Sequence, residues 1–186
     1  EGAALLAGDA LLVGAFDLIT RAEIKPSHRL QFVRELAQEC GIEGLIAGQM
    51  VDIESEGKKV DKKTINFIHE NKTAKLIRIC VRFGAIAGGA PAGELKLIEE
   101  YGSCVGMAFQ ITDDLLDIEG DPNELGKSVG KDEHVQKATY PAVYGIAESR
   151  RKAQELITQA REAINKLGDK ALMLDILAEH LLNRKS

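Results

Sequence analysis

Helical periodicity runs through almost the whole 186-residue chain and restricts the folds open to it. Apolar residues recur every three or four positions, only four prolines interrupt them, and no alternating β-branched run is bounded by turn residues. The sequence therefore predicts an all-α helical bundle with no internal repeat and no interdomain linker. The expected helices cover residues 3–20, 28–40, 42–55, 61–87, 92–119, 141–167 and 169–183.

Residues that commonly begin and end helices mark several of these boundaries. Ser27 and Asp61 are the expected N-caps of the second and fourth helices. Gly41 is expected to end the second helix, and Gly88-Gly89-Ala90-Pro91 to end the fourth. The helix over residues 3–20 carries small and apolar residues on all sides, so we expect it to be buried.

Composition and charge argue against several function classes. With 45% hydrophobic residues the chain can build a packed core, so intrinsic disorder is not expected. A net charge of −5 disfavours nucleic-acid binding, which normally needs a basic face. No signal peptide and no apolar run near the roughly 20 residues that span a bilayer are recognised. Three widely spaced cysteines without a CxxC pair favour reduced thiols, so a cytoplasmic protein without stable membrane insertion is expected.

The strongest chemical signal is the segment Phe109-Gln110-Ile111-Thr112-Asp113-Asp114-Leu115-Leu116-Asp117. On a helix, Asp113 and Asp117 stack one turn apart, and Gln110 lies on the same face. Two like charges in register destabilise a helix unless a cation lies between them, and ligands made only of oxygen favour Mg²⁺ over zinc or copper. A solvated acidic face is the common alternative, but the apolar neighbours of these acids are not typical of a polar surface helix.

Other features point to an anionic ligand. Lys72 falls in the middle of an apolar stripe on the helix over residues 61–87, where an ammonium group is costly unless an anion meets it. A lysine that reaches out to the solvent is the equal alternative. Residues 126–132, followed by Lys137, combine Gly, Lys and Ser directly after the acidic helix, where they could reach a ligand's phosphates. The segment is not a P-loop, and a surface loop with several lysines is the usual alternative, serving only solubility. Gln49 and Asp52 lie one turn apart and add a weaker signal.

In combination these segments resemble the trans-isoprenyl diphosphate synthases, of the bacterial farnesyl and geranylgeranyl diphosphate synthase type. The matching segments appear in the family's order and cover the whole chain. They are AGDAL at 7–11, GQMVD at 48–52, KT at 72–73, FQITDDLLD at 109–117, LGK at 125–127 and KATYP at 137–141. The combination is specific, whereas DDxxD alone also occurs in terpene cyclases.

The resemblance implies an all-α bundle around a central cavity and a prenyltransferase activity. Isopentenyl diphosphate would condense head-to-tail with an allylic diphosphate, namely dimethylallyl, geranyl or farnesyl diphosphate. Mg²⁺, with Mn²⁺ as an alternative, would assist ionisation of the allylic substrate. The resemblance also implies a cytoplasmic homodimer.

The resemblance further implies a role for each matching residue. The metal ligands would be Asp113, Asp114 and Asp117. The catalytic residues would be Lys72, Thr73 and Gln110, of which Thr73 and Gln110 would lie near the reacting allylic carbon. The other substrate-binding residues would be Gln49, Asp52, Phe109, Lys127, Lys137 and Arg184. Among these, Lys127 and Lys137 would join Lys72 on the allylic diphosphate, Phe109 would border the homoallylic substrate, and Arg184 with Lys185 would close over its diphosphate.

One part of the family's pattern has no match in this sequence. The family carries a first aspartate-rich motif and an Arg pair upstream, and a basic site for isopentenyl diphosphate still nearer the N-terminus. Glu1-Gly2 aligns just after that motif, and the chain does not begin with Met. We therefore expect residues 1–186 to form a single all-α domain that is incomplete at its N-terminus, lacks the N-terminal helices and does not turn over alone.

Two other functions share parts of this pattern. A non-catalytic regulatory subunit of a heteromeric prenyl synthase would be expected to lose acidic ligands, yet the three aspartates of the DDxxD segment are intact. A class I terpene cyclase would share the fold and the ionisation chemistry, but Lys72, the GK pair and the KATYP segment favour the synthase.

Overall fold

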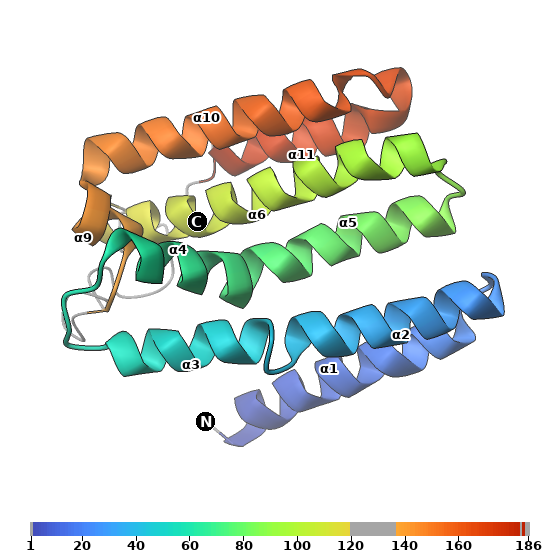
Figure 1. The fold of residues 1–186 in the computed structure, drawn as a ribbon, viewed down its shortest axis with the longest axis horizontal. Helices are drawn as coiled ribbons and strands as arrows, with labels where there is room; N and C mark the ends of the chain where they lie inside the picture. The colour runs from blue at the N-terminus through green and yellow to red at the C-terminus, as the bar shows by residue number, and fades with distance from the viewer. Residues whose placement is uncertain (1, 120–136, 183, 185–186) are drawn as a thin grey trace.

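The computed structural model describes residues 2–119, 137–182 and 184 of the chain. All regular elements in these residues are helical, which confirms the all-α prediction (Figure 1). In chain order they are α1 (Gly2–Arg21), α2 (Pro26–Cys40), α3 (Leu45–Ser55), α4 (Lys62–His69), the π-helical turn η1 (Glu70–Ala74), α5 (Lys75–Ala87), α6 (Ala92–Glu119), α9 (Tyr140–Tyr144), α10 (Ile146–Asn165), the 3₁₀ turn η2 (Gly168–Ala171) and α11 (Leu172–Leu182).

The long helices lie side by side, with α6 near the centre (Figure 1). Helix α6 packs chiefly against α10 and α5, and α2 packs on the other side of α5. The main core forms where α6 meets α4, α10 and α11, around fully buried residues such as Ile65, Tyr101, Ile111 and Ile157. This packing fixes α6, which carries the acidic segment, against the helix that carries Lys72.

Most helix boundaries follow local signals. Asp61 caps α4 as predicted, because its carboxylate accepts a hydrogen bond from the backbone N–H of Thr64 at 2.8 Å. The prediction for Ser27 was wrong: α2 begins two residues earlier than expected, at Pro26, and its N-cap Lys25 makes no side-chain capping hydrogen bond. Proline suits the first position of a helix because its missing N–H would have no partner there.

Several of the expected helices differ in detail. The helix expected from residue 42 begins at Leu45. The helix expected over residues 141–167 is divided at Gly145, whose φ of 85° lies in the left-handed region and separates α9 from α10.

The helix expected over residues 61–87 contains the π-helical turn η1, which includes Lys72. Two neighbouring helices approach this turn closely through glycines. A Cβ atom on Gly48 of α3 would lie 2.4 Å from the backbone nitrogen of Lys72, and one on Gly106 of α6 would lie 2.5 Å from Cα of Ala74. Both positions therefore require glycine for the backbones to pack as they do.

Helix α1 is not buried as predicted. None of its residues is buried, and Leu5, Leu11 and Leu18 are each at least 70% exposed. Its length and composition also meet the criteria for a membrane-spanning helix, contrary to expectation, although core helices and signal sequences meet the same criteria. An apolar helix with so little burial leaves a large hydrophobic face uncovered.

Candidate active site

Most of the predicted site residues lie on α3, η1 and α6, and both α3 and α6 pack against η1. Gln49 and Asp52 lie on α3, and Lys72 and Thr73 lie in the π-helical turn. Phe109, Gln110 and the three aspartates of the DDxxD segment follow one another along α6. Segments that are distant in the sequence thus contribute polar side chains to one region.

Lys72 is held by a buried carboxylate. Its Nζ atom lies 2.6 Å from Oδ2 of Asp52, a residue that is only 5% exposed. The Lys72 side chain itself keeps 29% of its surface exposed. The anion that offsets the burial of this lysine is therefore present in the protein, and the ammonium group remains accessible to a further anion.

Thr73 and Gln110 are joined across the interface between η1 and α6. The Thr73 hydroxyl donates to Oε1 of Gln110 at 2.8 Å, and Nε2 of Gln110 donates to Oδ1 of Asp114 at 3.1 Å. Both ends of the Gln110 amide therefore have partners, which fixes the direction of its dipole.

Asp114 is buried and surrounded by protein donors. Its Oδ2 atom accepts a hydrogen bond from the backbone N–H of Tyr140 at 2.7 Å and lies 3.1 Å from Nε2 of His69. The Tyr140 N–H is available because it lies in the first turn of α9, where N–H groups have no partner within the helix. Thr139 caps the same turn by accepting from Ala142. Both Asp114 oxygens thus have hydrogen-bonding partners within the protein.

Asp113 lies on a more open part of α6, and its side chain is 42% exposed. Arg184 donates to Oδ1 of Asp113 at 2.9 Å, and its guanidinium lies 4.6 Å from the centre of the Phe109 ring. Asp113 therefore already binds a cation in this structure. Asp117, one turn further along α6, is buried.

The other predicted residues are Gln49, Lys137, Lys127 and Lys185. Gln49 is half-buried and lies one turn before Asp52. Lys137 is half-buried and immediately precedes the segment that caps α9. Lys127 lies outside the described residues, as does Lys185.

Sequence reasoning missed His69, the last residue of α4. It is 2% exposed, and its ring stacks on Tyr140 with centroids 5.5 Å apart. Tyr140 stacks in turn on Tyr144, whose hydroxyl accepts from Asn66 at 3.1 Å. Burial raises the pKa of Tyr140 to about 12, so its phenol remains protonated near neutral pH. A lone histidine in an apolar stripe gives no sign of such partners until the fold is known.

The acidic residues suit an oxygen-binding cation that takes few protein ligands. Among the described residues, no group of three or more His, Cys, Asp or Glu side chains is arranged to hold a metal ion. Mg²⁺ commonly binds one or two carboxylates and completes its shell with water and substrate phosphates. Asp113 and Asp117, on successive turns of α6, fit this mode, and Mn²⁺ accepts the same oxygen ligands.

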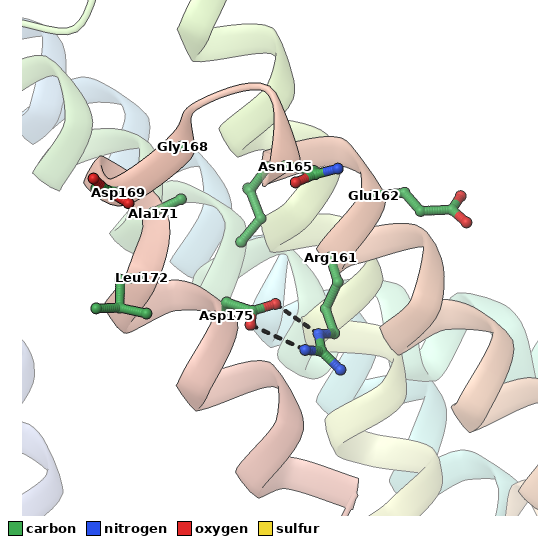
Figure 2. Close-up of a pocket in the computed structure, with 9 residues that line it drawn as sticks. Arg161, Glu162, Asn165, Gly168, Asp169, Ala171, Leu172 and Asp175 are labelled. Carbon is green, nitrogen blue, oxygen red and sulfur yellow. Dashed lines mark hydrogen bonds and ion pairs between the residues drawn. The ribbon is translucent and has the colours of Figure 1, made fainter.

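A cavity of about 460 Å³ lies at the other end of the bundle, at the turn between α10 and α11 (Figure 2). Arg161 spans one side and binds both oxygens of Asp175, at 2.6 and 3.0 Å. This pairing lowers the pKa of Asp175. None of the predicted site residues lines this cavity.

Comparisons with known proteins agree with the geometry. A family model described as polyprenyl synthetase matches residues 1–175. The chain is 39% identical over 191 residues to farnesyl diphosphate synthase of Escherichia coli K12, a match that covers 99% of this chain and 64% of that protein. A geranylgeranyl diphosphate synthase of Cyanophora paradoxa is 40% identical over 189 residues, covering all of this chain and 63% of its own length.

Solved structures show the same fold. Geranylgeranyl pyrophosphate synthetase of Pyrococcus horikoshii matches with a TM-score of 0.84 and 28% identity, covering 99% of this chain and 68% of that one. A geranyltransferase of Helicobacter pylori, in a complex with magnesium and isoprenyl diphosphate, matches with a TM-score of 0.81 and 30% identity, over 98% of this chain and 60% of that one. The chain spans between one half and two thirds of the curated relatives named above.

Proposed function

This chain belongs to the polyprenyl synthetase family, and from that premise we propose that it forms the allylic-substrate part of a trans-prenyl diphosphate synthase. The reaction would join isopentenyl diphosphate head-to-tail to an allylic diphosphate, such as dimethylallyl or geranyl diphosphate. The observation that carries the proposal is the pair Lys72–Asp52 beside the linked side chains of Thr73 and Gln110. It supplies an accessible ammonium group and, on the next residue along the chain, a hydroxyl held by a side-chain amide.

We assign the allylic diphosphate to the cationic side of this site. Lys72, oriented by Asp52, would bind the diphosphate, with Lys137 and Lys127 on the following segment as the further cations. When bound, Mg²⁺ would offset the negative charge that develops on the departing diphosphate, and Asp113 and Asp117 are the residues assigned to hold it. Arg184 would then leave Asp113 and bind the second diphosphate.

The residues of η1 and α6 would act on the hydrocarbon part of the allylic substrate. Breaking the allylic C–O bond leaves an allylic cation, which the oxygen dipoles of Thr73 and Gln110 can stabilise from a fixed position. Phe109 would border isopentenyl diphosphate, whose double bond attacks the cation, and Gln49 would line the same site. Apolar groups around the site would have to keep water from the cation. Loss of a proton gives the longer diphosphate.

This function predicts metal-dependent binding of an allylic diphosphate. Geranyl S-thiolodiphosphate, an analogue that ionises poorly, should bind the chain in the presence of Mg²⁺, and EDTA should abolish the binding measured by calorimetry. The change Asp113→Asn should weaken this binding by about tenfold or more, because it removes the exposed carboxylate assigned to the metal.

The matched control is Asp175→Asn, which breaks an exposed ion pair at the far end of the bundle (Figure 2). This variant should bind the analogue as the original chain does. Binding that is insensitive to EDTA, or an equal loss in both variants, would contradict the assignment of Asp113.

We also propose that the chain works as a cytoplasmic homodimer. The exposed apolar face of α1 requires a cover, and a second copy would supply one. Light scattering after size exclusion should give a mass near twice 20.2 kDa. Replacing Leu11 and Leu18 by Glu should reduce this mass to that of one chain, whereas Leu172→Glu on α11 should not. A monomeric original chain would contradict the proposal.

A further inference from the structure

His69 occupies a position that packing alone does not explain. Its ring is buried at the junction of α4 and η1, with Nε2 3.1 Å from the Asp114 carboxylate and Nδ1 buried without a hydrogen-bond partner. A buried carboxylate is stable only when donors surround its oxygens. The imidazole proton must therefore lie on Nε2, because an unprotonated Nε2 would present its lone pair to the carboxylate.

The hydrogen bonds of Asp114 connect His69 to the side-chain amide of Gln110. His69 and the Tyr140 N–H occupy Oδ2, so Oδ1 is the oxygen that accepts from Nε2 of Gln110. This hydrogen bond decides which end of the Gln110 amide faces Asp114. Oε1 is consequently turned toward Thr73 and accepts its hydroxyl proton.

The His69 ring is itself held in place. Tyr140 stacks on one side of it, at an interplanar angle of 26°, and Tyr144 stacks on Tyr140. The π-helical turn starts at the next residue, Glu70, so the backbone of His69 leads directly into the turn that carries Thr73. Turns of this kind often occur at functional sites.

We propose that His69 is a positioning residue, which acts through Asp114 to fix the Gln110 amide and the Thr73 hydroxyl at the reacting end of the allylic substrate. This inference rests on the function proposed above for the same site. It gives different roles to residues within the acidic segment: Asp113 and Asp117 are the residues that would hold the metal, whereas Asp114 connects His69 to the oxygen dipoles.

The test compares two replacements of His69. His69→Phe keeps a ring that can stack on Tyr140 but lacks the N–H group. His69→Gln loses the ring but can place a donor nitrogen near the position of Nε2. If His69 only fills space, the phenylalanine variant should behave as the original chain, and the glutamine variant should be the more perturbed.

The first readout is the side-chain amide signal of Gln110 in ¹⁵N-labelled protein, identified by its absence in Gln110→Glu. In the original chain its two protons should resonate far apart, since each end of the amide is held. In His69→Phe they should move to the values of a free glutamine, and in His69→Gln they should return to the values of the original chain. An unchanged Gln110 signal in His69→Phe would overturn the proposal.

The second readout is Mg²⁺-dependent affinity for geranyl S-thiolodiphosphate. We expect His69→Phe to weaken it by about fivefold, the effect of one lost hydrogen bond, and His69→Gln to restore it. An original chain that shows the expected Gln110 signal but no binding of the analogue would support the role of His69 while overturning the proposed function.

A third measurement does not depend on any variant folding. The long-range ¹H–¹⁵N spectrum of the original chain should show the His69 proton on Nε2. A proton on Nδ1 alone would leave a lone pair facing Asp114 and would overturn the proposal without further experiments.

Discussion

Incubated alone with isopentenyl diphosphate, dimethylallyl diphosphate and Mg²⁺, the 186-residue chain is expected to form no detectable longer prenyl diphosphate. Its sequence contains one DDxxD segment, residues 113–117, and no second one. The charge on a departing diphosphate must be neutralised from more than one side, and removing one such stabilising group typically slows a reaction by about 10²–10³-fold. A chain with a single set of such carboxylates should therefore turn over more slowly, by at least this factor, than one with two.

A fusion protein that adds an upstream segment from a relative tests the same expectation by gain of activity. The chain matches 64% of the Escherichia coli farnesyl diphosphate synthase. Since Glu1-Gly2 is expected to align just after the family's first aspartate-rich motif, the segment of that relative up to this point can be joined to residue 1. We expect the fusion to form product at least about 10³-fold faster than the chain alone. The same fusion carrying Asp113→Asn serves as the control and should lose most of the gain. An isolated chain that matches the fusion in rate would contradict the expectation.

Local signals explain why the long helices could be predicted. Asp61 caps α4 because a carboxylate at this position needs only the N–H groups of the next turn. The acidic segment lies on α6 because its apolar neighbours repeat with helical periodicity and pack against α5 and α10. In both cases the information lies within a few residues of the feature.

Other features depend on contacts between distant segments. A helix that is apolar on all sides, such as α1, gives no indication of what covers it, so its exposure could not be foreseen. The sequence indicates that Lys72 needs an anion but not that Asp52, twenty residues earlier, provides one. The role of His69 likewise depends on Asp114, on a helix that the sequence places 45 positions later.

The π-helical turn η1 is the clearest example of a feature that depends on contact with a distant segment. Its five residues leave the apolar stripe of the helix over residues 61–87 nearly intact, so periodicity alone predicts one continuous helix. The turn fits against α3 because Gly48 has no Cβ atom to meet the backbone of Asn71 and Lys72. One missing side chain on α3 thus permits the position of Lys72.

Replacing Gly48 by alanine should therefore destabilise the chain strongly. The added Cβ would lie 2.4 Å from the Lys72 nitrogen, a backbone atom that cannot rotate away. Overpacking of this kind lowers the free energy of unfolding by about 1–3 kcal/mol, which urea denaturation followed by circular dichroism can measure. Because the displaced backbone carries Lys72, affinity for geranyl S-thiolodiphosphate should also fall.

Gly84→Ala is the matched control for this change. Gly84 lies inside α5 on an exposed face, and a Cβ there would meet no atom within 4 Å. Alanine is the better helix former, so this variant should gain about 0.5–1 kcal/mol of stability and bind the analogue unchanged. The two substitutions are chemically identical and are expected to change stability in opposite directions. Shifts of the same sign would show that the close approach at Gly48 does not determine how α3 packs on the π-helical turn.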